Sequence, residues 1–340
     1  MKEYSLKERE LSRAAFVMMT PGQGSQFNGM AADLVQHPVG AAVFREVDEI
    51  LEFGLTELMC DPAGEALKDN AVAQPAIVAT TIAAREVYLA EHPDMTDIIP
   101  SFYIGHSLGE LTALYFAGVL TAHDVLVIAR ERGKLMQQVN EQTPGGIVTV
   151  ITKKEKDMIT VDEICNETGV CLATYNTPIQ VSISGLADNI QEAIILVKKA
   201  GFGFFPLNNV PPSHTQLMQP AMVGLRDFID RSRIVFRNAN APVITNLTGK
   251  SADRGTALQA ASIEQVVNPV RFEQGISYAR AHGLVNFVEF GPRTILAKFI
   301  PQIFPINKHG EEYFSALSIH DVKSAKEAVL TPWLKMAIWN

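Results

Sequence analysis

A chain of 340 residues, of which 47% are hydrophobic and 19% charged, has the composition of an ordinary soluble globular protein, long enough for one large domain with a smaller one attached or inserted. Its formal net charge of −8 argues against a nucleic-acid binder, which needs a basic surface, and no stretch approaches the roughly 18 uninterrupted apolar residues of a membrane helix. Three cysteines without a C-x-x-C spacing support neither a disulfide scaffold nor a zinc site, so we expect no metal.

Along the first 140 residues, strand-like and helix-like segments alternate. The first thirteen residues are charged and polar, without the apolar segment of a signal peptide, which predicts a cytoplasmic protein. A short apolar run then ends in a glycine-bearing loop, and a long apolar helix follows that we expect to be entered through Pro75. The expected elements are strands over residues 14–19 and 98–104 and helices over residues 74–90, 110–118 and 124–139. Repeated βα units predict a parallel sheet covered by helices, with functional groups at the carboxyl ends of its strands.

Pro144-Gly145-Gly146 marks a change of pattern. The following segments are shorter and run in the order β-α-β-β-α-β, which is typical of a ferredoxin-like module. Its expected strands are residues 147–151, 170–175, 180–184 and 202–207, and its expected helices are residues 160–168 and 187–200. We therefore predict an α/β fold, in which a hydrolase-like parallel-sheet domain contains an inserted ferredoxin-like subdomain. The predicted boundaries are residues 14–139 and 211–310 for the large domain, 140–210 for the small one, and 1–13 and 311–340 for peripheral extensions.

The most informative segment is Gly105-His106-Ser107-Leu108-Gly109, which places a serine between two glycines, after an apolar run and before a helical one. A serine at a tight strand-to-helix turn has strained backbone geometry that pushes its hydroxyl toward a substrate, and the helix N-terminus stabilises developing negative charge. A glycine-rich turn with a buried or capping serine is the structural alternative. Because a strand and a helix flank the segment, we favour a nucleophile elbow and acyl-transfer chemistry.

Eight motifs in register extend this interpretation, and together they resemble the malonyl-CoA:acyl carrier protein transacylases over roughly residues 14–305. They are Gly22-Gln23-Gly24-Ser25-Gln26, Gln74-Pro75, Gly105-His106-Ser107-Leu108-Gly109-Glu110, Arg132-Gly133-Lys134-Leu135-Met136, Pro212-Ser213-His214, Asn246-Leu247-Thr248-Gly249, Asn268-Pro269-Val270 and Gly291-Pro292. The family includes the fatty-acid synthesis enzyme and acyltransferases of polyketide synthases. The resemblance implies transfer of malonyl from coenzyme A to the phosphopantetheine thiol of an acyl carrier protein, through a serine acyl-enzyme and without a cofactor.

The resemblance also implies the catalytic residues. Ser107 matches the acylated nucleophile, and His214 matches the general base that takes its proton and later returns it to the leaving thiol. A hydrolase triad would add an acid between them, and four aspartates without any accompanying signature occupy that interval: Asp124, Asp157, Asp162 and Asp188. In the resembled family a backbone carbonyl orients the histidine instead, and Gln265 is the matching position, at which the side chain could be irrelevant.

Further positions match groups that would hold the acyl substrate. The backbone N–H groups of Gln23 and Leu108 would bind the tetrahedral oxyanion, and the loop around Gln23 lacks the lysine and spacing of a phosphate-binding loop. Arg132 matches the arginine that binds the malonyl carboxylate through two hydrogen bonds. The alternative interpretation is that Arg132 is an ordinary solvated residue on a helix. His106 is expected to be supporting structure near the acyl group.

Three departures from the family pattern leave the selectivity between malonyl and methylmalonyl open. Ser213 precedes His214 where many malonyl-specific polyketide acyltransferases have phenylalanine. Gly146-Ile147 stands where the family often has an alanine-methionine pair, and Ala73 replaces a polar residue. Since a methyl-sized difference is worth only about 1–3 kcal/mol in an apolar pocket, one residue is weak evidence for selectivity.

The second substrate, an acyl carrier protein, is strongly acidic, so a basic patch should surround the mouth of the site. Arg293, Lys298 and Lys308 are candidates for that patch, and each could equally be an ordinary solvated charge. Two other functions stay open: an acyl hydrolase of the same fold that clears carrier proteins in a polyketide assembly line, and a catalytically silent docking module. The intact Ser107, His214 and Arg132 favour the transferase over both.

Overall fold

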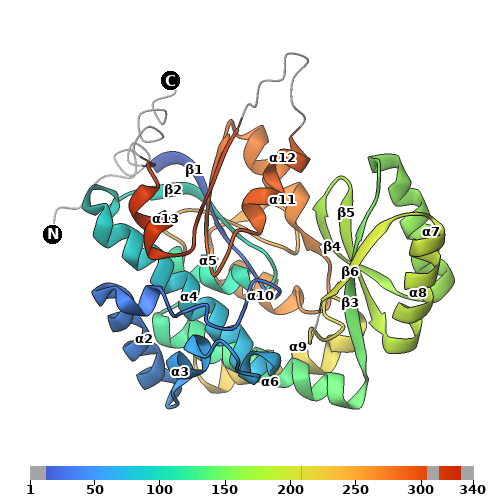
Figure 1. Ribbon diagram of the computed structural model, residues 1–340, viewed down its shortest axis with the longest axis horizontal. Coiled ribbons are helices and arrows are strands. Elements are labelled where there is room, and N and C mark those ends of the chain that lie inside the picture. Colours follow the sequence, from blue (N-terminus) through green and yellow to red (C-terminus); the bar gives the residue numbers. More distant parts are fainter. Residues whose placement is uncertain (1–12, 208, 305–313, 331–340) are drawn as a thin grey trace.

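The computed structural model describes residues 13–207, 209–304 and 314–330, which fold around two sheets (Figure 1). The larger sheet has six strands in the order β11-β10-β1-β2-β7-β8, and all neighbours are parallel except the pair β7 and β8. Its strands are β1 (Arg13–Thr20), β2 (Ile99–Gly105), β7 (Val243–Ile244), β8 (Ser251–Ala252), β10 (Asn286–Phe290) and β11 (Ser315–Ile319). The expected parallel sheet is present, and β1 and β2 lie at its centre.

Helices cover both faces of this sheet, as the alternation of apolar residues in β1 requires. Phe16 and Met18 point into one hydrophobic core, while Val17 and Met19 point into the other. The helices of the first face are α2 (Pro38–Leu51), α3 (Leu55–Cys60), α4 (Asn70–Glu91), α5 (Gly109–Phe116), α6 (Ala122–Gln142), α9 (Gln219–Arg231), α10 (Gly255–Glu264) and α13 (Val322–Glu327). The second face carries α11 (Phe272–Ala281) and α12 (Ile300–Ile303). Both faces of β1 are therefore buried under helices, as is typical of parallel sheets.

Short 3-10 helices join several of these elements. In the described part of the chain, no helix is long and apolar enough to cross a membrane. The 3-10 helices are η1 (Leu34–Gln36), η2 (Ala66–Lys68), η3 (Pro93–Met95), η4 (Glu155–Asp157), η5 (Gln216–Met218) and η6 (Leu296–Lys298).

The start of α4 differs from the expectation. The helix does not begin at Pro75 but at Asn70, because the Asp69 carboxylate accepts a hydrogen bond from the N–H of Ala71 and caps the first turn. Pro75 then lies inside the helix, where it cannot donate to the carbonyl one turn back.

The smaller sheet has the order β6-β3-β5-β4-β9, and its first four strands are antiparallel. Its elements are β3 (Gly145–Ile151), α7 (Met158–Thr168), β4 (Cys171–Thr177), β5 (Gln180–Leu186), α8 (Ala187–Lys199) and β6 (Gly203–Leu207). A fifth strand, β9 (Val270–Arg271), comes from a later part of the chain and pairs parallel with β4. Val148 and Val150 pack under the two helices, whereas Ile147 and Thr149 point to the opposite face. In Figure 1, α7 and α8 lie on the outer side of this sheet, so its other face looks toward the larger sheet.

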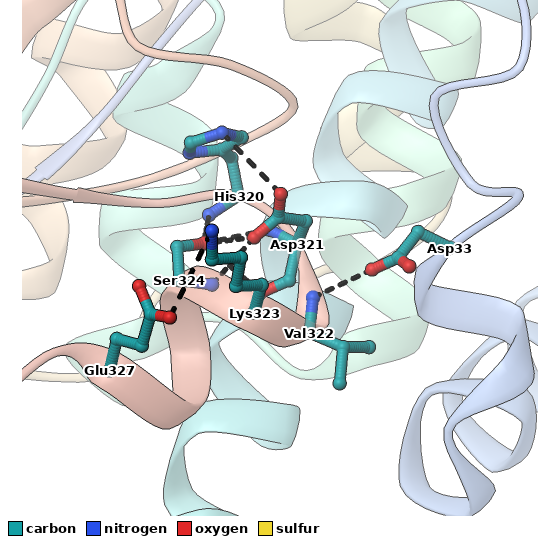
Figure 2. A network of polar contacts seen from close by, with 7 residues as sticks. All are labelled: Asp33, His320, Asp321, Val322, Lys323, Ser324 and Glu327. Carbon is teal, nitrogen blue, oxygen red and sulfur yellow. Dashed lines mark hydrogen bonds and ion pairs between the residues drawn. The ribbon is translucent and has the colours of Figure 1, made fainter.

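The expectation that residues 311–340 are peripheral is wrong for the part that the structure describes. Strand β11 extends the larger sheet beside β10, and α13 packs on α4 with Ala325 fully buried. Figure 2 shows how α13 is fastened: Asp321 caps its first turn by accepting from Ser324 N at 2.6 Å, and the Asp33 carboxylate accepts from Val322 N at 2.7 Å. This segment is therefore part of the main fold.

Candidate active site

The tight strand-to-helix turn expected at Ser107 forms where β2 passes into α5. Ser107 has a φ of 51°, in the left-handed region that non-glycine residues seldom occupy. The flanking glycines allow this turn because the segments around it approach too closely for a side chain. A Cβ on Gly105 would collide with the backbone of Gly109, and a Cβ on Gly109 would collide with the carbonyl oxygen of Thr20 at the end of β1.

His214 reaches the elbow from the connection between β6 and η5. Its φ of 63° is also left-handed, and its N–H donates to the carbonyl of Val266 at 2.9 Å, which ties this connection to the segment after α10. The residue is 3% exposed. Its Nε2 lies 2.8 Å from the hydroxyl oxygen of Ser107. The two residues are 107 positions apart in the chain and hydrogen-bond directly.

The other ring nitrogen of His214 settles which tautomer is present. Nδ1 lies 2.7 Å from the carbonyl oxygen of Gln265 and 3.1 Å from that of Asn268. A carbonyl oxygen can only accept, so Nδ1 carries the hydrogen, and Nε2 of the neutral ring accepts the hydroxyl proton of Ser107. Burial, together with the positive charge of Arg132, lowers the pKa of His214 to about 3. The imidazole is therefore a neutral base that points at the serine.

None of the four aspartates between Ser107 and His214 orients the histidine, because carbonyl oxygens take its Nδ1 hydrogen. Asp124 instead belongs to the capping box at the start of α6, with Thr121 as its partner. Asp157 accepts a hydrogen bond from Lys154 N at the start of η4. Within the described ranges, no group of three or more His, Cys, Asp or Glu side chains is arranged to hold a metal ion.

Arg132 lies on α6 and is 2% exposed. Its Nη2 lies 3.3 Å from the Ser107 hydroxyl oxygen, and its Nη1 donates to Oε1 of Gln74 at 2.8 Å. Burial lowers the pKa of Arg132 to about 10, and the nearby Glu110 carboxylate opposes that shift, so the guanidinium is charged at neutral pH. Two hydrogen bonds use only part of its five N–H donors, which leaves it able to bind an anion beside the serine.

Amide side chains continue from Arg132 to the loop around Gln23. Gln74 Nε2 lies 3.0 Å from Gln23 Oε1, Gln23 Nε2 lies 2.6 Å from Asn70 Oδ1, and Asn70 Nδ2 lies 2.5 Å from Gln137 Oε1. These residues come from the loop after β1, from α4 and from α6. Gln23 is thereby fixed through its side chain, and its backbone N–H remains to be used at the site.

The loop that carries Gln23 packs against the elbow. A Cβ on Gly22 would collide with the carbonyl oxygen of His106 and would lie 3.4 Å from the backbone nitrogen of Leu108. The backbone of Gly22-Gln23 therefore passes directly beside that of Leu108, as two donors to one oxygen atom require. Leu108 precedes α5, so the positive end of the helix dipole faces the same place.

A cavity of about 310 Å³ opens at Ser107 and His214 between the two sheets. Its floor includes Gln23 and His106, and its other wall is the inner face of the smaller sheet, including Ile147 and Thr149. His106 lines the cavity as well, and its Nε2 lies 2.7 Å from Oδ1 of Asn176. The cavity is large enough for an acyl group with part of a carrier arm.

The three departures from the family pattern fall in different places. Ser213 and Ile147 line the cavity, so both shape the volume beside an acyl group. Ala73 is buried in α4 and does not line the cavity. A Cβ on Gly146 would meet open space, so this glycine is not required by packing.

The three candidates for the basic patch differ in where they lie and in what they contact. Lys298 lines the cavity, whereas Lys308 lies outside the described residues. Arg293 is committed to the protein: its Nε donates to the carbonyl of Ser25 at 2.9 Å, its Nη2 donates to that of Gln26, and its guanidinium lies 4.8 Å from the ring centroid of Phe27. Arg293 therefore holds the loop around Gln23 in place.

Sequence reasoning missed the part that Glu110 and Asn246 play. Both stand in quoted motifs, yet the motifs alone give them no contact. In the structure, Asn246 Oδ1 accepts from the N–H of Ser107 at 3.1 Å, and the Asn246 N–H donates to the Glu110 carboxylate at 2.5 Å. A signal was available for Glu110, because a carboxylate in the apolar first turns of a buried helix is unusual and needs partners.

The similarity of this chain to known proteins agrees with the geometry. The family model described as acyl transferase domain matches residues 16–330. The chain belongs to the acyl transferase domain family. Among its relatives, the malonyl CoA-acyl carrier protein transacylase of Bacillus subtilis strain 168 is 34% identical to this acyl transferase over 297 residues, which cover 86% of this chain and 91% of the relative.

Solved structures give the same result. The acyl-carrier-protein S-malonyltransferase of Bartonella henselae superposes on this acyl transferase with a TM-score of 0.83 at 27% identity, covering 94% of this chain and 99% of the other. A complex of a type II polyketide synthase acyl-carrier protein with its malonyl-transacylase gives a TM-score of 0.81 at 30% identity, with coverages of 92% and 98%. The family resemblance predicted from the motifs is confirmed.

Proposed function

We propose that the protein transfers a malonyl group from coenzyme A to the phosphopantetheine thiol of an acyl carrier protein, by way of an ester on Ser107. One observation carries the proposal: a serine hydroxyl is hydrogen-bonded to a neutral, carbonyl-oriented histidine and, on another side, to a buried arginine. The first pair is a nucleophile with its base, and the arginine adds a site for a carboxylate at the distance of a short acyl chain.

Acylation would begin with His214 Nε2. It takes the hydroxyl proton of Ser107 while Oγ forms a bond to the thioester carbon, and the carbonyl oxygen becomes an oxyanion. The N–H groups of Gln23 and Leu108 stabilise that oxyanion. The carbon–sulfur bond then breaks, His214 returns the proton to the coenzyme A sulfur, and malonyl remains as an ester on Ser107.

Deacylation reverses these steps with a new thiol. His214 takes the proton of the phosphopantetheine thiol, the sulfur attacks the malonyl ester, and the proton returns to Ser107 as the carbon–oxygen bond breaks. Both half reactions use only groups of the protein and its two thiol substrates, so no resident cofactor is required. Of the candidates for the basic patch, Lys298 lines the cavity, so it is the one that we propose contacts the acidic carrier.

Arg132 would select a dicarboxylic acyl group. Its guanidinium is charged and buried, so it has lost its hydrogen bonds to water. An acyl chain that carries a carboxylate replaces those hydrogen bonds. A neutral acyl group such as acetyl offers no carboxylate to accept hydrogen bonds from the remaining guanidinium N–H groups. The position of Nη2 beside the Ser107 oxygen supports a carboxylate only a few bonds from the reacting carbon.

We also infer that residues 140–210 form an inserted subdomain of the ferredoxin-like class. The element order β-α-β-β-α-β and the antiparallel order β6-β3-β5-β4 support this assignment. On this proposal, the large domain consists of residues 14–139 and 211–310 together with β11 and α13, and the insertion supplies one wall of the cavity. The strand β9 would then join the inserted sheet to the large domain.

The test is intact-protein mass spectrometry of the protein mixed with malonyl-, methylmalonyl- or acetyl-CoA and then with a phosphopantetheinylated carrier protein. We expect a malonyl adduct that is absent in Ser107→Ala and moves to the carrier. In Arg132→Ala, malonyl labelling should fall by about 10²-fold relative to acetyl, since a charge-assisted bidentate contact is lost.

The matched control is Arg130→Ala on the same helix. Arg130 donates to the carbonyl of Leu51 and lies over the ring of Phe53, away from the serine, so its replacement should leave the malonyl-to-acetyl ratio unchanged. Release of free malonate faster than transfer to the carrier would contradict the transferase and favour a hydrolase. An unlabelled wild-type protein would contradict both enzymatic functions.

A further inference from the structure

Glu110 occupies an unusual place for a carboxylate. It lies in the first turn of α5, three residues after the nucleophile, and is 1% exposed. Its Oε2 accepts from both the N–H and the side-chain Nδ2 of Asn246, and its Oε1 accepts from Nε2 of Gln265 at 3.2 Å. Three donors from two distant segments of the chain therefore converge on one buried side chain.

Each partner of Glu110 in turn holds one of the reacting residues. The Oδ1 atom of Asn246 accepts from the backbone N–H of Ser107 at 3.1 Å. The carbonyl of Gln265 accepts from Nδ1 of His214 at 2.7 Å. One path leads from Glu110 to the nucleophile and the other leads from Glu110 to the base.

We propose that Glu110 is a positioning residue that fixes Ser107 and His214 relative to each other by holding Asn246 and Gln265 at the same time. The inference rests on the proposed function only in taking Ser107 and His214 as nucleophile and base. Both have left-handed backbone conformations, so the turns that carry them need support from outside their own segments. A carboxylate suits this task because it has two acceptor oxygens for three donors.

The charge of Glu110 is balanced locally. Arg132 is the charged group that acts on it, and burial raises the pKa of Glu110 to about 7 while the hydrogen bonds from Asn246 and the charge of Arg132 oppose that rise. The hydrogen bonds from Asn246 oppose the effect of burial more strongly than the charge of Arg132 does, so Glu110 is held mainly by hydrogen bonds. An amide of the same shape should then preserve much of its effect.

Glutamine is that conservative replacement. In Glu110→Gln, the amide oxygen still accepts from Asn246, while the amide nitrogen faces Gln265. Among the described residues, Gln265 Oε1 has no hydrogen-bond partner, so a rotation of that amide would present it as an acceptor. In Glu110→Met, a side chain of similar length accepts nothing, and both paths are broken.

The experiment measures two rates of modification of Ser107 by rapid quench and intact mass: acylation by malonyl-CoA, and labelling by a fluorophosphonate, which needs only the nucleophile and its base. In Glu110→Met both limiting rates should fall by about 10²-fold, with half-saturation by malonyl-CoA within about threefold of wild type, because misplacement of reacting atoms affects turnover more than binding. Glu110→Gln should restore both rates to within about tenfold of wild type.

A double-mutant cycle separates positioning from general damage. Asn246→Ala breaks the path to Ser107, so adding it to Glu110→Met should cost much less than the product of the two single effects. Val87→Ala, in the buried part of α4 and remote from the site, serves as a control with reduced thermal stability and unchanged labelling rates. Multiplicative effects in the cycle, or wild-type rates in folded Glu110→Met, would overturn the proposal.

The two reagents also separate this inference from the proposed function. If malonyl-CoA fails to acylate the wild-type protein, the proposed substrate is wrong. The fluorophosphonate rates then still decide whether Glu110 positions Ser107 and His214. If malonyl-CoA acylates wild type and Glu110→Met alike, the function stands and the inference falls.

Discussion

Ser107 and His214 meet in a conformation that neither would adopt alone. Their φ angles of 51° and 63° cost about 1–3 kcal/mol each in the left-handed region, and that cost must be offset by the surrounding structure. The N–H of each residue is held from another segment, Ser107 by Asn246 and His214 by Val266. The strain is therefore maintained by contacts that span the fold.

The buried state of His214 has a consequence for stability. The pKa of His214 is about 3 in the folded protein, against 6.5 in an unfolded chain, so between these values the unfolded chain binds more protons. Stability should therefore fall as the pH falls from 6.5 toward 3. Relative to His214→Gln, which cannot titrate, the wild-type free energy of unfolding should drop by about 1.4 kcal/mol per pH unit between pH 6 and pH 4.

Urea unfolding of both proteins at several pH values checks this prediction. The comparison cancels the carboxylates that the two proteins share. A difference in unfolding free energy that does not change between pH 6 and pH 4 would show that the folded protein protonates His214 readily.

At the scale of single residues, the sequence predicts the candidate site residues better than it predicts the side chains that hold them by hydrogen bonds. Ser107, His214, Gln265 and Arg132 were expected together from their motifs, and the structure places them within hydrogen-bond reach as one chain of contacts. The family match left the role of the Gln265 side chain open, and in the structure that side chain donates to Glu110. Such partners could not be predicted because their pairing depends on how remote segments pack.

At the scale of elements, the elbow depends on how closely α5 approaches the end of β1. The helix begins at Gly109, whose backbone lies against the carbonyl of Thr20, and the Thr20 hydroxyl donates to the Gly109 carbonyl at 2.8 Å. This contact fixes the angle at which the strand-to-helix turn leaves the sheet. A side chain at residue 109 would push the helix away.

We predict that Gly109→Ala destabilises the protein by about 1–3 kcal/mol, since its Cβ would overlap the backbone oxygen of Thr20. Gly146→Ala is the matched control, because a Cβ there meets open space and should change stability by less than about 0.5 kcal/mol. Thermal or urea unfolding of the two variants gives the comparison. Equal stabilities would mean that α5 can shift without loss.

The elements that the sequence predicted share long or regular apolar patterns. The strands and helices of residues 147–207 fall within a few residues of their expected bounds, because alternation in the strands and helical spacing are both clear there. Strands β7, β8 and β9 have two residues each, too few to show any period. The start of α4 was misplaced because the proline signal outweighed the cap at Asp69.

At the scale of the whole molecule, the C-terminal part of the described chain supports the helix that carries part of the site. α13 packs on α4, and the carbonyl of Ala325 accepts a hydrogen bond from Nε2 of His92 at 2.8 Å, just after α4 ends. The N-terminal half of the same helix carries Gln74, which binds Arg132. One long helix thus connects the last described helix with the side chain of Arg132.

Ala325→Asp should destabilise the protein by about 2–4 kcal/mol, because it places an unpaired carboxylate at a fully buried position against α4. Lys326→Asp puts the same side chain one residue along on the exposed side of α13 and should cost at most about 1 kcal/mol, because it replaces a cation by an acid in the last turn of the helix. Denaturant midpoints of the two variants measure the difference. Similar midpoints would show that α13 separates from α4 at little cost.

The amide side chains behind Ser107 donate their hydrogen bonds in one direction, which Arg132 sets. A guanidinium cannot accept a hydrogen bond, so the oxygen of Gln74 must face it, and each following amide at Gln23, Asn70 and Gln137 must then turn its oxygen toward Arg132 and its nitrogen away. Four side chains from three segments thereby point their dipoles in one direction. At the far end of the row, Gln137 Nε2 donates to the Glu141 carboxylate at 3.3 Å, so an anion there demands the same orientation that the cation demands at the serine.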